Sequence, residues 1–194
     1  MNLKTIALGL AVAAGLLFTQ ASAALAGDTK AEAYCIKKGG AVQTRIPEYG
    51  TNGGTALVLA HKAEFCQFTA KDSSQINVLL STLKTEMPTL AALAYYAQVP
   101  LGSGCTGNPA SCYCSQLGGS DLFGGVNAAG GGWVLSTDPN DVLESCVFPD
   151  QSSIDSWGLA YHSADIIRGK NLAHVLKYPN PYTAAGHDKT KRPY

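Results

Sequence analysis

The sequence predicts an α+β protein made of two tandem units, each stapled by a disulfide and each containing a short N-terminal helix, a small antiparallel β-sheet and a following helix. Three observations lead to this prediction: an internal repeat, an even number of cysteines, and a change from helical to alternating periodicity after each unit's first helix. They place unit 1 at residues 28–97, a linker at 98–107, unit 2 at 108–178 and a mobile tail at 179–194.

The repeat is visible when the chain is aligned with itself. Five residues recur 79 positions later, and three more recur 80 positions later. The pairs are Ala31/Ala110, Tyr34/Tyr113, Cys35/Cys114, Gly39/Gly118, Gly40/Gly119, Glu64/Glu144, Cys66/Cys146 and Phe68/Phe148. Two copies are too few for a solenoid, so we expect either one pseudo-symmetric body or two touching modules.

The N-terminus has the layout of a secretory signal. Lys4 precedes an apolar run, Ile6–Phe18, and small-residue sites end at Ala23 and Ala26. We therefore expect cleavage of residues 1–23, or 1–26, and a periplasmic or secreted location, with a buried N-terminal helix as the alternative. The run is too short to span a bilayer and no later run is apolar enough, so we expect no stable membrane insertion.

The charge balance argues against a nucleic-acid partner. The chain has 14 basic and 14 acidic residues, and removal of Lys4 with the signal leaves 13 basic residues against 14 acidic ones. Nucleic-acid binding needs a basic surface that neutralises phosphates. The composition offers no such surplus.

Six cysteines in an exported chain predict three disulfides, because an oxidising compartment lets the bond persist. Self-contained units pair Cys35 with Cys66 and Cys114 with Cys146, which leaves Cys105 for Cys112. On a helix Cys112 and Cys114 lie about 200° apart, so they can face different partners. This geometry argues against the alternative that Cys112 and Cys114 form a metal or redox pair.

Unit 1 opens with a predicted helix over Thr29–Lys38, because Thr29 and Glu32 have capping-box spacing and glycines follow. The later elements of unit 1 are predicted in order. They are a strand carrying Val42, Thr44 and Ile46, a turn at Pro47 and Gly50–Gly54, one or two strands over Leu57–Phe68, a helix carrying Ile76, Leu79, Leu80, Leu83 and Met87, and a helix after Pro88.

Unit 2 reaches a similar plan with other residues. Asn108 caps its first helix, Pro109 takes the first helical position and Gly118–Gly119 ends it. The remaining elements are again predicted in order. They begin with hairpin turns over Gly124–Gly132 and strands at Trp133–Leu135 and Ser145–Phe148, which an Asp138–Asn140 turn separates. A helix follows that is capped by Ser152 and Asp155 and whose inward face is Ile154, Trp157, Gly158 and Tyr161. A short helix is predicted at Leu172–Lys177.

A family resemblance rests on motifs of unit 2. These are Asn108-Pro109-Ala110-Ser111, Tyr113-Cys114, Gly118-Gly119, Cys146-Val147-Phe148-Pro149-Asp150 and Trp157. The motifs resemble a small exported bacterial domain of unknown function that is often labelled hemolysin, closely over residues 108–161 and more loosely over 31–68. The resemblance implies a periplasmic setting. It does not imply lysis, since a pore-former needs a long amphipathic or apolar segment and none follows the signal.

Two function hypotheses follow. We favour a non-catalytic exported binding or inhibitory module, whose partner is a protein or a component of the cell envelope, because rigid stapled units present glycine-rich loops. The contact region is then expected in the loops Ile46–Leu57 and Gly124–Trp133. Its candidate residues are Tyr49, Asn52, Gly131, Gly132 and Trp133, with Trp133 as an exposed aromatic contact.

The second hypothesis is a small exported hydrolase that uses Ser153 as nucleophile and His162 as base. The chain has no Gly-x-Ser-x-Gly elbow, and turn and cap roles already explain the nearby serines and aspartates. We therefore expect no catalytic activity. The spacing of His162, Asp165, His174 and His187 matches no known metal site, so we expect neither a metal nor a cofactor.

Overall fold

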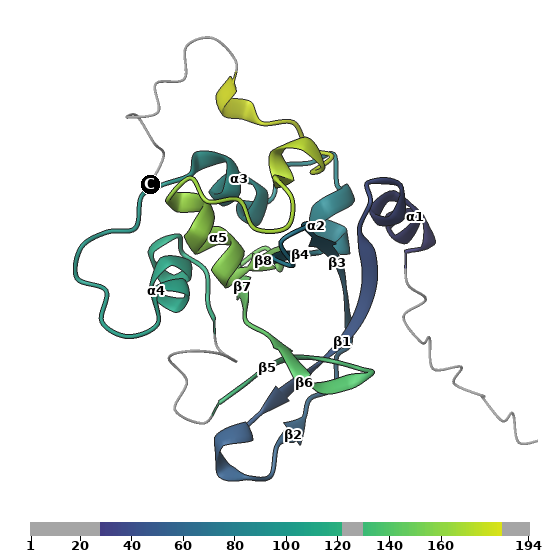
Figure 1. Cartoon of the computed structure of the whole chain (residues 1–194), viewed down its shortest axis with the longest axis vertical. Helices are drawn as coiled ribbons and strands as arrows, with labels where there is room; N and C mark the ends of the chain where they lie inside the picture. The colour runs from purple at the N-terminus through teal and green to yellow at the C-terminus, as the bar shows by residue number, and fades with distance from the viewer. Residues whose placement is uncertain (1–27, 122–129, 184–194) are drawn as a thin grey trace, which may run out of the picture.

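The computed structural model describes residues 28–121 and 130–183 of the chain. Within these residues the chain forms five α-helices around one curled antiparallel sheet, so the α+β class is confirmed (Figure 1). The predicted signal, the end of the predicted tail and most of the predicted Gly124–Gly132 turns lie outside the described residues.

Strands from both predicted units belong to this single sheet, so neither unit has a separate sheet of its own. Its strand order is β6-β5-β1-β3-β4-β8-β7, and β2 pairs with β1 off this path. The strands are β1 (Ala41–Tyr49), β2 (Leu57–Val58), β3 (Ala63–Thr69), β4 (Gln75–Leu79), β5 (Gly131–Leu135), β6 (Asp138–Leu143), β7 (Ser145–Val147) and β8 (Ser153–Asp155).

Strands from the two predicted units meet in the sheet at the antiparallel pair β4–β8, which joins Val78 to Ile154. Outward from this pair the sheet repeats itself, because Val78 pairs with Cys66 on one side and Ile154 pairs with Cys146 on the other. Beyond β7, the described residues continue the sheet only as an isolated bridge between Ser120 and Val147.

Helices cover the outer face of the sheet, which carries Cys66, Phe68, Val78 and Ile154 (Figure 1). The α-helices are α1 (Thr29–Lys37), α2 (Leu80–Lys84), α3 (Leu90–Ala97), α4 (Pro109–Gln116) and α5 (Ser156–Ser163), and 3-10 turns lie at Thr51–Gly53, Leu172–His174 and Pro181–Thr183. Fully buried residues from strands and helices form one cluster between these layers. This cluster is the main hydrophobic core.

The three disulfides join the cysteines that the sequence pairs: Cys35–Cys66, Cys105–Cys112 and Cys114–Cys146. All four cysteines of the two long bridges are fully buried. Glycines make room for these bridges, because a Cβ at Gly40 would lie 2.9 Å from Cys35 Sγ and still closer to Cys66 Sγ. Gly119 lies in the same way against Cys114 and Cys146.

Helix starts follow local capping chemistry, although the capping residue of α1 differs from the prediction. Asp28, not Thr29, caps α1 by accepting a hydrogen bond from Lys30 N at 3.0 Å. Asn108 caps α4 as predicted, through a 2.9 Å bond from Ala110 N. Asp155 caps α5 by accepting from Gly158 N at 2.8 Å.

Several predicted boundaries were wrong because strand pairing overrides local periodicity. Ile76 and Leu79 belong to strand β4, which pairs with β3, so the helix begins only at Leu80. Ile154 lies in β8. Ser152 does not cap α5, because its Oγ accepts a hydrogen bond from Ala91 N in the first turn of α3, whose N-cap is Thr89. Pro47 continues strand β1, and Asp138–Asn140 lies in strand β6.

The same Asp-x-Ser turn closes two hairpins of the sheet. In the β3–β4 hairpin, Asp72 Oδ1 accepts from Ser74 Oγ at 2.7 Å, and in the β7–β8 hairpin Asp150 Oδ1 accepts from Ser152 Oγ at 2.6 Å. The middle residues, Ser73 and Gln151, have φ values of 67° and 64°. Each turn therefore uses one left-handed residue and one carboxylate to reverse the chain.

Candidate functional site

The inner face of the curled sheet is the face opposite the main core. Residues paired across an antiparallel ladder point to the same side, so the register places Arg45 and Pro47 of β1 on this face, with Trp133 of β5 opposite Pro47. Gln75 and Asn77 of β4 alternate with the core residues Ile76 and Val78 and so share the inner face. Long polar side chains thus gather on one side of a sheet whose other side is apolar.

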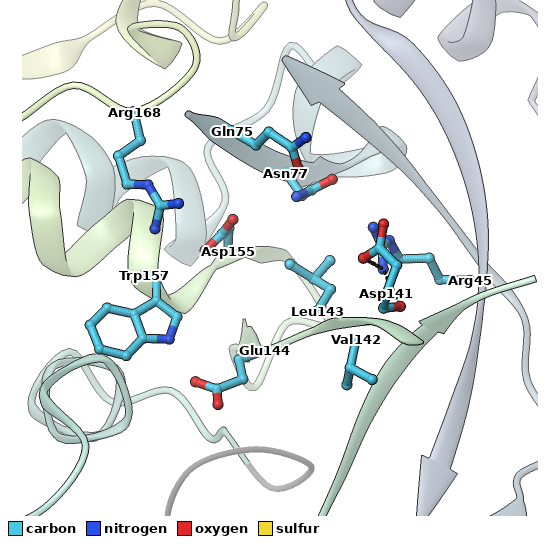
Figure 2. Close-up of a pocket in the computed structure, with 10 residues that line it drawn as sticks. All are labelled: Arg45, Gln75, Asn77, Asp141, Val142, Leu143, Glu144, Asp155, Trp157 and Arg168. Atoms are coloured by element: carbon cyan, nitrogen blue, oxygen red, sulfur yellow. Dashed lines mark hydrogen bonds and ion pairs between the residues drawn. The ribbon is translucent and has the colours of Figure 1, made fainter. Parts of the chain in front are cut away.

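A polar cleft of about 210 Å³ opens at one end of this inner face (Figure 2). It is lined by Arg45, Gln75, Asn77, Asp141, Val142, Leu143, Glu144, Asp155, Trp157 and Arg168. These residues come from β1, β4, β6, the β6–β7 connection, β8, the start of α5 and the segment after α5. Only the folded sheet brings them together.

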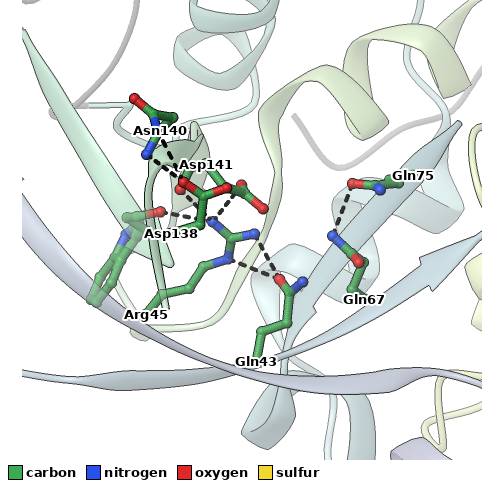
Figure 3. A network of polar contacts seen from close by, with 8 residues as sticks. Gln43, Arg45, Gln67, Gln75, Asp138, Asn140 and Asp141 are labelled. Atoms are coloured by element: carbon green, nitrogen blue, oxygen red, sulfur yellow. Dashed lines mark hydrogen bonds and ion pairs between the residues drawn. The ribbon is translucent and has the colours of Figure 1, made fainter. Parts of the chain in front are cut away.

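Arg45 is the most buried charged group of the cleft, with 1% of its surface exposed. Its Nη1 pairs with Asp141 Oδ1 at 3.0 Å and donates to Trp133 O, also at 3.0 Å. Its Nε donates to Gln43 Oε1 at 3.1 Å, and Nη2 binds the same oxygen at 2.6 Å (Figure 3). This network ties β5 and β6 to β1 and satisfies a charge that would be costly to bury alone.

Asn77 and Asp155 lie side by side at the centre of the cleft and are 3% and 6% exposed (Figure 2). Burial raises the pKa of the Asp155 carboxyl, although the N–H of Gly158 and the Asn77 side chain partly offset this. In the part of the chain that the structure describes, Asn77 Oδ1 is buried and has no hydrogen-bond partner. An unsatisfied buried carbonyl beside a carboxyl is unusual in a folded protein.

The rim of the cleft carries Glu144, Trp157 and Arg168. Glu144 Oε2 accepts a 3.0 Å hydrogen bond from Asn108 Nδ2. The Trp157 ring is 5.9 Å from the Tyr161 ring, and the Arg168 guanidinium lies 5.0 Å from the Tyr161 ring centre. In Figure 2 the Arg168 guanidinium points toward Trp157 and Asp155, so a cation and an aromatic ring face the buried carboxyl.

A second, mainly apolar cavity of about 580 Å³ includes the other end of the inner face. We call it the Trp133 pocket. It is lined by Pro47, Leu59, His61, Gly118, Gly119, Ser120, Trp133, Val147, Phe148, Pro149 and Gln151. Trp133 is half-buried, and its ring meets the buried Phe65 edge-on at 5.6 Å. The predicted exposed aromatic contact is therefore the partly covered wall of a pocket.

The other predicted contact residues gather beside this pocket. Tyr49 pairs with Gly131 in the β1–β5 ladder, and Gly50 N donates to Gly130 O at 2.9 Å, so the two predicted loops are neighbours along their described parts. Gly131 and Gly132 lie inside β5, where a Cβ would press against β1 or β6. Asn52 is exposed on the adjacent 3-10 turn.

The residues of the hydrolase hypothesis have structural partners. Ser153 is buried in β8, where its Oγ contacts Ser145 Oγ and donates to Cys146 O at 3.0 Å. His162 stacks on Tyr95 with ring centres 3.9 Å apart, and burial lowers the pKa of its imidazole. Over residues 28–121 and 130–183, no hydrogen bond joins Ser153 to His162.

Metal-binding clusters and membrane-spanning helices are both absent from the described residues. Among them, no group of three or more histidine, cysteine, aspartate or glutamate side chains is arranged to hold a metal ion. Within the same residues, no helix combines the length and the apolar character needed to cross a membrane.

Sequence reasoning found Trp133 but missed the polar cleft. The signal for the cleft was a long polar side chain at every second position, Gln43 and Arg45 in β1 and Gln75 and Asn77 in β4, which places these groups on one side of each strand. An exposed sheet face gives the same alternation, so the pattern alone does not distinguish a cleft from solvent. Only the curl of the sheet and the position of β6 enclose these side chains.

Comparison with known proteins gives no match of any kind. No protein-family model, no curated protein and no solved structure matches the chain.

Proposed function

We propose that this protein is exported and acts as a non-catalytic binding or inhibitory module. Its three disulfides fit an oxidising compartment, either the periplasm or the outside of the cell. The partner is a protein or a component of the cell envelope, and one of its apolar groups occupies the Trp133 pocket. The observation that carries this proposal is the pocket itself, an apolar cavity with a tryptophan wall.

The size and setting of the Trp133 pocket support this role. Its volume of about 580 Å³ falls within the range of about 300–1,000 Å³ that is usual for ligand pockets. Leu59 on its wall follows Leu57 and Val58, which are 61% and 67% exposed. Exposed apolar residues beside a concave pocket favour a contact surface over a solvated face.

The test compares two tryptophan variants, since the chain has only two tryptophans and each lines a different cavity. The mature protein, Trp133→Ala and Trp157→Ala are each immobilised and exposed to a periplasmic extract of the native host, with crosslinking. We expect Trp133→Ala to weaken partner binding by about 30-fold or more, because truncated aromatic anchors cost 2 kcal/mol or more. Trp157→Ala should retain the partner.

A second variant separates binding from folding. Leu57→Ser changes an exposed side chain near the pocket and should weaken partner binding with no change in thermal stability. Circular dichroism checks that each variant is folded. Equal capture of the same partner by the native protein, Trp133→Ala and Leu57→Ser would show that the contact surface lies elsewhere.

The hydrolase that uses Ser153 and His162 stays an alternative, without a geometric observation that favours it. An ester, peptide and glycan panel tests it directly. Turnover that Ser153→Ala and His162→Ala both abolish would establish the hydrolase and overturn the non-catalytic proposal.

We also propose that residues 28–97 and 108–178 are two copies of one exported unit related to the hemolysin-labelled domain. The similar disulfide separations of 31 and 32 residues, the paired glycines Gly40 and Gly119, and the two Asp-x-Ser turns support a duplication. A solved structure of any single-unit member of that domain would test it. An unrelated strand order around its disulfide would contradict the relationship.

A further inference from the structure

The polar cleft at the other end of the inner face contains a group that folding alone does not explain. Arg45, Asn77 and Asp155 are each more than nine-tenths buried, and burying such groups costs free energy unless hydrogen bonds compensate. Arg45 is compensated by Asp141, Gln43 and Trp133 O. Asn77 is not, because its Oδ1 has no partner within the described residues.

Asn77 Oδ1 needs a hydrogen-bond donor from outside the described chain. A buried carbonyl of this kind is satisfied by ordered water or by a ligand. Asn77 lines a cleft of about 210 Å³, a space equal to about seven waters at roughly 30 Å³ each. A ligand that reaches Asn77 can therefore replace several waters and supply an O–H or N–H to the carbonyl.

The neighbouring groups offer both donors and acceptors. Gln75 Oε1 accepts from Gln67 Nε2 at 2.9 Å, which directs the Gln75 amide nitrogen to other partners (Figures 2 and 3). Glu144 uses Oε2 to accept from Asn108, so its second oxygen is an acceptor at the rim. A hydroxyl both donates and accepts, and so it suits a wall on which the two kinds of group are mixed.

The charges of the cleft disfavour strongly charged ligands. Two arginines face three carboxyl groups, and the Arg45–Asp141 ion pair balances one charge of each sign. Arg168 is then the remaining cation, opposed by Asp155 and Glu144, so a phosphate would meet carboxylates as well as one guanidinium. The described residues also contain no arrangement of ligands for a metal ion.

The size and shape of the cleft narrow the class of ligand further. Pockets for drug-sized ligands enclose about 300–1,000 Å³, so a cleft of about 210 Å³ admits a smaller molecule, on the order of one sugar ring. Trp157 supplies an aromatic surface at the rim, against which the apolar C–H groups of a ring can pack while its hydroxyls bind polar groups.

We propose that the polar cleft binds a neutral, hydroxyl-rich molecule of monosaccharide size. Asn77 Oδ1 accepts a hydrogen bond from one ligand hydroxyl, Gln75 Nε2 and Arg168 donate to others, and Trp157 packs against the ring. This site is separate from the Trp133 pocket, so a result on the proposed partner binding neither supports nor contradicts it.

The two tryptophans allow the cleft to be monitored by itself. In Trp133→Phe the only remaining tryptophan is Trp157, whose fluorescence then reports on the polar cleft. This variant is titrated with neutral hexoses, an N-acetylhexosamine and a hexitol, and in parallel with neutral amino acids and inorganic phosphate. We expect a saturable change with at least one sugar or polyol at a Kd of about 1 mM or tighter. We expect no saturable change with phosphate or amino acids.

Variants in the Trp133→Phe background locate the binding. Asn77→Ser and Gln75→Ala should each weaken sugar binding about 3- to 10-fold, the usual effect of one lost hydrogen bond. Asn140→Ala, on exposed β6 outside the lining residues, is the matched control and should leave the Kd unchanged. If Asn77→Ser does not fold, Gln75→Ala and Arg168→Ala still test the cleft.

The proposal is overturned by any of three results. These are no saturable response to any sugar or polyol, tighter binding of amino acids or phosphate than of sugars, and sugar binding that Gln75→Ala and Arg168→Ala leave unchanged. A loss of partner binding in Trp133→Ala affects only the proposed function, because the cleft does not contain Trp133.

Discussion

We call residues 28–97 the first half and residues 108–178 the second half; they share the features around their long disulfides and differ in what surrounds them. In the first half β1 pairs with β3 over five residues, from Ala41 opposite Gln67 to Arg45 opposite Ala63. Within the described residues of the second half, the corresponding pairing is the single bridge between Ser120 and Val147. The disulfide, the glycine beside it and the hairpin turn are shared, whereas the described part of the outer strand is much shorter in the second half.

The strands that follow in the second half do not continue that outer strand. Instead, β5 pairs with the free edge of β1 in the first half, and β6 pairs with β5. This pairing brings Asp141 over Arg45 and Trp133 beside Pro47. Both cavities of the inner face thus depend on the region in which the halves differ.

The halves also exchange contacts through their equal turns. Ser74 Oγ, in the first half, accepts a 3.0 Å hydrogen bond from Gly169 N of the second half. Ser152 Oγ, in the second half, accepts a 3.0 Å bond from Ala91 N of the first. Burial alone would raise the pKa of Asp150, but hydrogen bonds from Ser152 and Leu90 N outweigh it and lower the pKa. Each turn therefore anchors the other half.

The largest expected effect concerns the disulfides. Removing Cys35–Cys66 or Cys114–Cys146, whose cysteines are 31 and 32 residues apart, should cost about 4 kcal/mol in each case, because the unfolded chain regains loop entropy. Removing Cys105–Cys112, separated by 7 residues, should cost about 2 kcal/mol. Urea denaturation of the three double Cys→Ala variants measures these losses. Unequal losses of unfolding free energy on removal of the two long bridges would contradict the equivalence of the halves.

The second prediction concerns how the pH dependence of stability differs between the halves. Ser120 in the second half corresponds to Ala41 in the first half, so Asp121 corresponds to Val42. Asp121 is 4% exposed. Burial raises its pKa from 3.8 to about 6, with Ser111 Oγ donating to its Oδ2 at 3.0 Å. Because the folded protein binds this proton more tightly, the added stability is fully present below about pH 4 and is lost as the pH rises to about 6. The change is on the order of 3 kcal/mol.

Asp121→Asn should abolish this part of the pH dependence. We expect the variant to be more stable than the native protein above pH 6 and to show a flatter profile between about pH 4 and 6. Urea denaturation at several pH values measures both. An unchanged profile would mean that Asp121 ionises in the folded protein as easily as in the unfolded chain.

The third prediction tests the shared glycines. Gly40→Ala and Gly119→Ala each place a methyl group against a buried disulfide sulfur, and each should cost about 1–3 kcal/mol by overpacking. Thermal denaturation with the disulfides intact compares the two. A cost for only one of them would show that the halves relax differently around the same contact.

The smallest effect concerns the turn serines. Ser152→Ala removes a buried acceptor at the start of α3 and should cost about 1 kcal/mol. Ser74→Ala removes the equivalent acceptor for Gly169 N. This position is less buried, so the loss of unfolding free energy should be smaller, about 0.5 kcal/mol. Hydrogen exchange at Ala91 and Gly169 measures each loss locally. Exchange that stays unchanged in both variants would contradict the reciprocal anchoring.

Much of the local structure could be predicted from the sequence. Asn108 caps α4, as its position before Pro109 indicates, and the repeat predicts all three cysteine pairs. Predictions failed where a segment had two plausible local forms. Ile76 and Leu79 have helical spacing with Leu83, yet pairing with β3 makes the first two a strand. Of the candidate site, Trp133 was identified, whereas Asn77 was not, because its role depends on strands distant in the chain.

By itself, the sequence determined the α+β class, the covalent frame of three disulfides and the start of α4. These features depend on residues close in the chain or on a repeat that can be counted. Only the tertiary structure decided that β5 and β6 join the first half, and with them where Asp141, Trp133 and Arg45 meet. Strand pairing across 88 residues is set by which faces become buried together, and no local pattern encodes that choice.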